Sequence, residues 1–347
     1  MSNRRKYFWL GIGLVTMVLL AGATYLSYRW IEGPNVTMTD EMAYLHIFEE
    51  TDFKTLKNQL EDSAYVENLP SFSRVASWMK FKDSRIKPGR YALSNGMSNR
   101  SLINLLRSGR QSPVDITFNN VRDLGGLAAV ITQKLLLDSA TFHTHLLTDR
   151  ASQTVDLEKE SLLTIFIPNT YRIYWNTTAE ELMQRMIAEH KKFWQSKNRS
   201  ELANDLEMTP AEVYTLASIV EKETQANSER PIVAGLYLNR LERGIPLAAD
   251  PTVVFAVGNF ELRRVLNKHL AIDSPYNTYK YAGLPPGPIY MPSISSIDAV
   301  LNADDHDYLY MCARPDNSGR HAFAASIRAH SKNANAYRRW LDQRGIF

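Results

Sequence analysis

The N-terminal part of the chain holds the feature that most limits its architecture, because residues 7–28 include no charged side chain. A helix rises about 1.5 Å per residue, so a segment of this length covers roughly the 30 Å hydrocarbon core of a bilayer. The sequence therefore predicts a single transmembrane anchor over Tyr7–Arg29, preceded by a short cytoplasmic tail over residues 1–6.

The charges beside this segment predict its orientation. Three basic residues precede it, at positions 4–6, and Arg29 alone follows it. The positive-inside rule places the amino terminus in the cytoplasm and everything after Arg29 outside the cytoplasmic (inner) membrane, on its periplasmic face. A cleaved signal peptide is the alternative, because Ala21-Gly22-Ala23 is similar to a cleavage site. Apolar and aromatic residues continue to Trp30, where interfacial aromatics belong, and this favours a single-pass anchor.

Beyond the anchor, the composition is that of folded protein. The chain has 347 residues, 44% hydrophobic and 22% charged, which is enough for two globular units. When positions 4–6 are set aside, 37 of the 40 basic residues remain, and they balance the 37 acidic residues. A neutral body argues against nucleic acid as a partner, because that partner requires a basic face. The single cysteine, Cys312, cannot form an internal disulfide and gives no evidence about compartment.

Between residues 33 and 155, a layout of strand, capped helix and return strand recurs. Leu45 and Ile47 alternate as in a short strand, and Thr51-Asp52 begins a helix. The corresponding residue types follow at a constant shift of 71 residues, at Ile116, Phe118 and Asp123. A looser third copy runs over residues 91–106. One interpretation is an α+β spacer that holds the rest of the chain away from the membrane.

A polar run over residues 149–156, followed by an expected apolar strand over Leu162–Ile167, predicts a boundary near residue 156. An amphipathic helix is expected over Ala179–Trp194. We therefore expect an α+β protein in which an N-terminal transmembrane helix is followed by an α+β region over 33–155 and a second α+β domain over 156–347.

One helix of the second domain has a well-specified beginning. Thr209 offers a hydroxyl cap, Pro210 takes the first helical position and Glu212 can complete a capping box. The helix should run from about Pro210 to Thr224. Its buried stripe recurs at helical spacing, at Val213, Leu216, Ala217, Val220 and Thr224.

Glu221 and Glu223 fall on opposite flanks of that stripe, at the far end of the helix. A half-buried glutamate without a compensating cation has a raised pKa and keeps a proton near neutral pH, as a general acid requires. The alternative is two solvated glutamates that pair with Lys222 or Arg230. Helix geometry alone does not choose between the two acids.

Asn239 and Arg240 follow in the next helix, which we expect over Glu229–Arg243, with Ser228 as its cap and Gly244 ending it. They could reach a sugar amide or a peptide carboxylate, although the helix macrodipole also favours an arginine at this position.

Further on, Asp250 stands before a proline and fits an N-cap better than an active-site carboxylate. The proline-rich segment 274–289 is expected to be a stiff extended loop with aromatic faces that suit a sugar chain, or else a packed connection. Its candidate substrate contacts are Tyr276, Asn277 and Tyr279.

No metal or cofactor is expected. His143 and His145 lack a carboxylate partner at ligand spacing. The runs Ser77-Trp78-Met79-Lys80 and Ser196-Lys197-Asn198 match two motifs of penicillin-binding enzymes, but the Lys-Thr-Gly strand that those enzymes require is absent from the sequence.

Five blocks of the second domain resemble the MltG/YceG-like endolytic transglycosylases of bacterial peptidoglycan. In the order of that family, they are Leu216–Thr224, Asn239–Leu241, Asp250–Thr252, Ser274–Tyr279 and Gly283–Ile289. The chain departs from the family after the last block, where members often have Asn-Pro-Gly and this sequence reads Tyr290-Met291-Pro292-Ser293.

The resemblance implies that Glu221, the first glutamate of the Val-Glu-Lys-Glu segment, is the essential acid, and that the region over 33–155 is a LysM-like glycan-binding region. It also implies an endolytic lyase that cuts between N-acetylmuramic acid (MurNAc) and N-acetylglucosamine (GlcNAc) in nascent glycan strands, leaves 1,6-anhydroMurNAc ends and thereby terminates elongation. Peptidoglycan synthases (penicillin-binding proteins) are the implied protein partners. Two alternatives stay open, namely a hydrolytic muramidase that uses Glu221 with Asp250 and a non-catalytic wall-binding scaffold for synthases.

Overall fold

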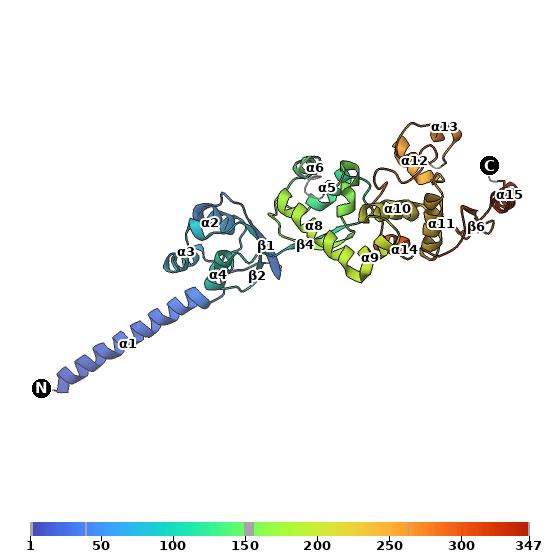
Figure 1. Ribbon diagram of the computed structural model, residues 1–347. Coiled ribbons are helices and arrows are strands. Elements are labelled where there is room, and N and C mark those ends of the chain that lie inside the picture. Colours follow the sequence, from blue (N-terminus) through green and yellow to red (C-terminus); the bar gives the residue numbers. More distant parts are fainter. Residues whose placement is uncertain (1–2, 39, 149–155, 263, 346–347) are drawn as a thin grey trace. The chain divides into compact units, whose positions relative to one another are not determined.

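The computed structural model describes residues 3–38, 40–148, 156–262 and 264–345. The chain forms two compact units (Figure 1): unit 1 holds Met1–Val114 with Arg172–Asn176, and unit 2 holds Asp115–Tyr171 with Thr177–Phe347. Both units combine helices with short two-stranded sheets, which confirms the α+β prediction. Residues 149–155 of the expected polar boundary lie outside the described residues, and a functional division at residue 155 stays a prediction.

The first element, α1 (Asn3–Glu32), is one continuous apolar helix of 30 residues. Over Lys6–Glu32 it is long and apolar enough to cross a membrane, with a mean hydropathy of 1.8 and no burial of its apolar window in the described chain. Such a helix is compatible with a single-pass anchor and with a signal sequence.

The carboxyl end of α1 is fastened to the body of unit 1. Asn99 donates from Nδ2 to the Trp30 carbonyl at 2.9 Å, and Glu32 pairs with Arg100 at 2.6 Å. The Arg74 guanidinium also stacks over the Trp30 ring, 4.8 Å from its centroid. Within unit 1 the helix therefore joins the globular part without a flexible linker.

The body of unit 1 contains a strand, two helices and a return strand, followed by a third helix. Its elements are β1 (Met42–Ile47), α2 (Phe53–Asp62), α3 (Leu69–Trp78), the 3-10 helix η1 (Asp83–Arg85), β2 (Gly89–Ser94) and α4 (Asn99–Ser108). β1 and β2 pair antiparallel, with Leu45 opposite Tyr91. Side chains from both strands and from α2, α3 and α4 form one buried core.

The predicted repeat at a shift of 71 residues is confirmed in local structure. Asp52 caps α2 and Asp123 caps α5, each accepting a backbone N–H three residues on at 2.7 Å. The helices place Leu56 and Leu127 at corresponding, fully buried positions. The elements of the second copy are β3 (Val114–Phe118), α5 (Leu124–Thr132), α6 (Ser139–Leu146), the 3-10 helix η2 (Lys159–Ile165) and β4 (Asn169–Ile173), and β3 pairs with β4.

The rest of unit 2 is mostly helical. Its elements are α8 (Ala179–Gln195), η3 (Ser196–Asn198), α9 (Arg199–Asp205), α10 (Pro210–Glu223), η4 (Asn227–Glu229), α11 (Arg230–Glu242), α12 (Asp250–Val257), α13 (Asn267–Leu270), α14 (Ile294–Leu301), β5 (Tyr310–Ala313), β6 (His321–Ala324) and α15 (Ile327–Asp342). α10 is the central helix, since α9, α11, α12, α14 and η2 all pack against it. The predicted helix over Ala179–Trp194 is confirmed as α8.

The prediction of a strand over Leu162–Ile167 is wrong, because these residues lie largely in η2. A short continuous apolar run does not distinguish a buried strand from a buried helical segment. The segment is fully covered, and the Tyr214 hydroxyl of α10 donates to the Phe166 carbonyl at 3.0 Å.

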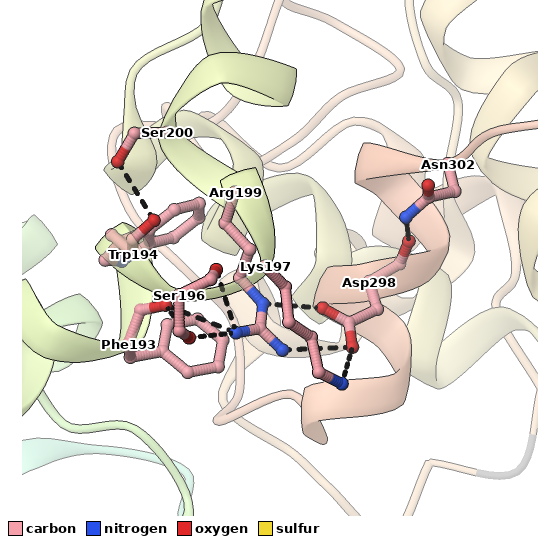
Figure 2. Close-up of polar contacts among 8 residues, drawn as sticks. All are labelled: Phe193, Trp194, Ser196, Lys197, Arg199, Ser200, Asp298 and Asn302. Carbon is pink, nitrogen blue, oxygen red and sulfur yellow. Dashed lines mark hydrogen bonds and ion pairs between the residues drawn. The ribbon is translucent and has the colours of Figure 1, made fainter.

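A partly buried ion pair fastens α9 to α14 (Figure 2). Arg199, whose side chain is 5% exposed, donates to Asp298 through Nε at 2.7 Å and Nη2 at 3.1 Å. Its Nη1 donates to Ser196 Oγ at 2.7 Å, and its guanidinium stacks over Phe193. The Ser196-Lys197-Asn198 run is thus a structural corner, in which Lys197 and Asn198 adopt positive φ.

Candidate active site

The helix that carries both candidate acids begins as predicted. The Thr209 side chain accepts the Glu212 backbone N–H at 3.2 Å, and the Glu212 carboxylate accepts the Thr209 N–H at 2.7 Å, which completes the capping box. Val213–Val220 are all buried. Because the helix is fixed at its start and buried through its middle, the two glutamates at its far end have defined positions.

The Glu221 carboxylate, 15% exposed, is held on both oxygens. Oε2 accepts the hydroxyls of Ser296 and, at 2.6 Å, Ser293, while Oε1 accepts Arg230 Nη2 at 3.1 Å. Burial raises the pKa of Glu221, but the two serine hydroxyls and the Arg230 charge outweigh burial, so the pKa lies below its usual value. The raised pKa expected of a glutamate here is therefore wrong for Glu221, because Arg230 is a compensating cation.

Glu223, two residues later, has the opposite surroundings. Burial raises the pKa of this half-buried carboxyl to about 7; the Asp250 charge adds to the rise, and a hydrogen bond from Tyr237 and the Arg240 charge oppose it. The Tyr237 hydroxyl donates to Oε1 at 2.8 Å. Near neutral pH, Glu223 is therefore divided between its acid and its carboxylate forms, the condition that suits a group which both gives and takes a proton.

Two hollows meet at Glu223. The first, of about 560 Å³, is lined by Arg122, Lys222, Glu223, Asp250, Pro251, Val254, Phe255, Phe260, Leu262, Arg264, Val265, Ile289 and Tyr290. The second, of about 330 Å³, is lined by Glu223, Leu236, Tyr237, Arg240, Leu247, Ala248, Asp250, Tyr279, Leu309–Ala313, His321 and His330. Glu223 and Asp250 belong to both linings, whereas Glu221 belongs to neither among the described residues.

A third hollow, of about 400 Å³, continues the series, because it shares Arg122 and Phe255 with the first and adds Tyr276. The three hollows thus adjoin one another through shared side chains, and the acid lies at the junction of two of them. A row of adjoining hollows fits an extended ligand better than a compact one.

Asp250 is the second carboxylate at this junction, and the prediction that it caps α12 is wrong. The N-cap is Ala249, and the Asp250 side chain makes no capping bond. The exposed carboxylate instead accepts the Tyr279 hydroxyl at 2.6 Å. The preceding backbone is already held by Thr278, whose hydroxyl accepts the Ala249 N–H at 3.1 Å.

Comparison with known proteins agrees with these features. The model of the YceG-like family matches residues 45–336. The chain belongs to the YceG-like family. A Bacillus subtilis (strain 168) protein named endolytic murein transglycosylase is 32% identical over 277 residues, which cover 75% of this chain and 76% of the relative. A Streptococcus pneumoniae serotype 2 protein of the same name is 28% identical over 356 residues, and the match covers 92% of this chain but only 63% of that relative.

A solved structure supports the family at the level of the fold. The crystal structure of a putative yceG-like protein from Listeria monocytogenes is 26% identical, with a TM-score of 0.54. The match covers 84% of this chain and 98% of that one.

In the Asn-Arg-Leu block of this YceG-like chain, the two polar side chains hold backbone. Asn239 donates from Nδ2 to the His306 carbonyl at 2.6 Å, and Arg240 donates to the carbonyls of Leu309 and Leu247 at 2.7 Å each. Asn239 is therefore occupied as a fastening residue, whereas Arg240 also lines the second hollow.

The loop that carries the Ser274–Tyr279 block divides its candidate residues. Asn277 is fully buried and donates to the carbonyls of Leu270 and Ile272, both at 2.9 Å, so it has no access to a ligand. Tyr276 packs against Phe255 with ring centroids 4.6 Å apart and lines the third hollow, while Tyr279 lines the second. Of the three predicted contacts, the two tyrosines face hollows.

The neighbouring helix α11 differs from the prediction at its start and agrees with it at its end. Ser228 does not cap it, because Ser228 lies in η4 and the residue at the N-cap position is Glu229, which makes no capping bond. Glu229 instead accepts the His321 backbone N–H at 3.0 Å. Gly244 follows the end of the helix with a φ of +63°, as predicted.

Four residues that shape the site were not candidates from the sequence: Arg122, Tyr237, Ser293 and Ser296. The two serines lie 72 and 75 residues beyond Glu221. Their only local indication is the serine-rich start of a helix where the family's Asn-Pro-Gly is replaced. In the described part of the chain, no group of three or more His, Cys, Asp or Glu side chains is arranged to hold a metal ion.

Proposed function

We propose that this protein is an endolytic peptidoglycan transglycosylase that cleaves the MurNAc–GlcNAc bond within glycan strands, with Glu223 as its acid. The observation that carries the proposal is the position of Glu223, a carboxyl with a pKa of about 7 on the shared wall of two hollows. The names of the relatives from Bacillus subtilis and Streptococcus pneumoniae support the reaction.

Glu221 is the competing acid, and the family resemblance favours it. Its surroundings suit a structural carboxylate better, because Ser293, Ser296 and Arg230 occupy its oxygens and lower its pKa. A general acid needs a proton to give and a path to the leaving oxygen. Glu223 has both at neutral pH, so we assign the acid to Glu223 and a positioning role at the end of α10 to Glu221.

The junction of hollows also supports cleavage within a strand. An enzyme that binds sugars on only one side of the broken bond releases short ends. Here the second hollow adjoins the first at Glu223 and Asp250, and the third adjoins the first at Arg122 and Phe255. Sugar rings in the adjoining hollows would place a glycosidic oxygen beside the acid.

In the proposed reaction, Glu223 protonates the bridging oxygen as the bond to the anomeric carbon of MurNAc breaks. The C6 hydroxyl of the same MurNAc then attacks that carbon and gives its proton to the Glu223 carboxylate. The products are a GlcNAc hydroxyl end and a 1,6-anhydroMurNAc end, and the acid returns to its protonated form. The attacking hydroxyl is tethered to its target, which supplies much of the advantage that a second catalytic group would give. Anhydro ends cannot be extended, so the reaction would terminate strand elongation.

Hydrolysis is the second candidate, and Asp250 favours it. The Asp250 carboxylate lines both hollows beside Glu223 and accepts the Tyr279 hydroxyl. A muramidase that hydrolyses its substrate usually has two carboxyl groups facing one cleft, one as the general acid and one that activates water. The relevant partner of Asp250 is then Glu223 in place of Glu221.

We further propose that α1 anchors the protein in the cytoplasmic membrane with its amino terminus inside. The strand, two helices and antiparallel return strand of unit 1 support a LysM-like glycan-binding role for that region. Peptidoglycan synthases are the proposed protein partners, because they make the strand that would be cut.

Mass spectrometry of the products tests the proposal. The full-length protein in detergent is incubated with uncross-linked glycan strands, and the released fragments are measured. Internal cuts with anhydroMurNAc ends support transglycosylation, whereas fragments heavier by one water identify a muramidase. If the protein binds the strands and releases no fragment, it is a scaffold and the enzymatic proposal is wrong.

A further inference from the structure

The wall of the first hollow carries three cationic side chains, from Arg122, Lys222 and Arg264. Arg122 lies just before the N-cap of α5, and Lys222 lies between the two glutamates of α10. The acids of this hollow, Glu223 and Asp250, also line the second hollow. The first hollow is therefore the one that combines the acid with a set of positive charges.

Aromatic rings hold two of these cations in place. The Arg122 guanidinium lies 3.6 Å from the centroid of the Phe260 ring, and the Lys222 ammonium lies 3.2 Å from that of Tyr290. Neither cation makes an ion pair with a residue in the described ranges of the chain. Such cation–π contacts fix a charge but leave its hydrogen-bond donors free for another partner.

The two cations are also close enough to affect each other. Burial lowers the pKa of Lys222, and the Arg122 charge lowers it further, while the Glu221 charge opposes both. Like charges brought together at the edge of a hollow repel each other, and a bound anion relieves that repulsion.

We propose that Arg122 and Lys222 bind a carboxylate carried by the substituent at O3 of muramic acid. This inference rests on the proposed function, since it assigns a charge to a substrate that the junction of hollows admits. The repeating GlcNAc–MurNAc backbone is otherwise uncharged, so the muramoyl substituent is where a strand offers anions. A volume of about 560 Å³ is within the range of sites that hold small ligands, and it accommodates a sugar with part of its substituent.

The carboxylate has two possible sources. In a peptide-bearing strand it belongs to the peptide, whose amide bond consumes the lactyl carboxyl. In a strand freed of peptide, the lactyl carboxylate itself is present. The shared chemistry is a carboxylate a few bonds from the muramic ring, and the substrates of the test separate its sources.

The test compares three substrates for the full-length protein in detergent: peptide-bearing strands, strands freed of peptide, and peptide-bearing strands whose carboxyl groups have been converted to amides. The expected result is that amidation lowers kcat/KM at least about tenfold, because a charge-assisted hydrogen bond to each cation is lost. The faster of the two carboxylate-bearing substrates identifies the source. Equal rates on amidated and unmodified strands would overturn the inference, whereas no cleavage of any substrate would overturn the proposed function instead.

Variants connect the effect to the two side chains. Arg122→Gln combined with Lys222→Gln should lower kcat/KM on carboxylate-bearing strands to about the rate on amidated strands, mainly through KM. Arg122→Lys keeps the positive charge, so this variant should retain most of the native kcat/KM on carboxylate-bearing strands. Lys191→Gln, at an exposed lysine of α8, is the matched control for loss of a positive charge. A double variant that still prefers carboxylate-bearing strands as strongly as the native protein would also refute the assignment, and its melting temperature shows whether it is folded.

Discussion

Glu221 and Glu223 lie two residues apart on one helix, share the same sequence environment and have opposite electrostatics. Glu221 receives two hydroxyls and a guanidinium, so its carboxylate is stabilised. Burial and the charge of a neighbouring aspartate raise the pKa of Glu223 against the opposing effect of one phenolic hydrogen bond, so the carboxyl keeps a proton near pH 7. The chemistry of a carboxyl group is therefore decided by segments that arrive from elsewhere in the chain, and the helix only presents the group to them.

The largest expected effect concerns activity. Glu223→Gln removes the proton that the reaction needs and should lower kcat on glycan strands by about 10²–10⁴-fold. Glu221→Gln, compared at a temperature at which it is folded, should lower kcat far less. Release of anhydro fragments over time measures both. The reverse ranking, with Glu221→Gln nearly inactive and Glu223→Gln active, would return the acid to Glu221.

The pH dependence of the reaction sharpens the same comparison. An acid with a pKa of about 7 is protonated below that pH, so kcat/KM should fall as the pH rises through 7, by about tenfold for each further pH unit. If Glu221 with its lowered pKa were the acid, the fall would occur in the acidic range. The profile is measured in overlapping buffers at constant ionic strength, because the substrate and the first hollow carry charges.

A smaller effect is expected on stability at neutral pH. Glu221→Gln leaves the buried Arg230 guanidinium without its counter-charge and should destabilise the protein by about 1–3 kcal/mol. Because the pKa of Glu221 is lowered in the folded state, its contribution is present above the unfolded pKa and is lost as the pH falls through the folded value. Urea unfolding at pH 7 and at a pH below the lowered pKa of Glu221 measures this, and equal losses at both pH values would contradict it.

The smallest expected effect is on stability at Glu223, where the substitution to Gln should stabilise the protein in place of destabilising it. A raised pKa means that the folded protein binds the Glu223 proton more tightly, so the native protein loses stability as the pH rises from the unfolded value toward 7. Glu223→Gln carries no such penalty. It should therefore be more stable than the native protein above pH 7, by about 1–2 kcal/mol after allowance for partial exposure, and should show little difference near pH 4. Urea unfolding of both proteins from pH 4 to above pH 7 measures this difference in the free energy of unfolding.

Much of the local structure could be predicted, because it depends on neighbours in sequence. Caps and apolar periodicity indicated α10 from Thr209 onward and the strand and helix repeat at Asp52 and Asp123. The strand predicted from the apolar run at Leu162–Ile167 was wrong, because the run is buried throughout. Continuous burial removes the hydrophobic period that separates a strand from a helix.

The site could be predicted only in part. Its helix and both glutamates were identified, but not which of them keeps the proton, because Ser293 and Ser296 reach Glu221 from across the fold. Asp250 and Asn277 were misjudged for a related reason. Asp250 fits the local rule for an N-cap, yet its carboxylate faces the hollows, and the side chain of Asn277 is buried by backbone carbonyls that its own loop brings together.

The ion pair between Arg199 and Asp298 extends the consequences of this arrangement beyond α10. It fixes α14, and the serines that hold Glu221 stand at the start of that helix. A substitution that breaks this ion pair would let Ser293 and Ser296 move away from Glu221. The pKa of Glu221 would then change, although no catalytic group had been substituted. Loss-of-function substitutions in this family are therefore to be sought around residue 298 as well as in the cleft.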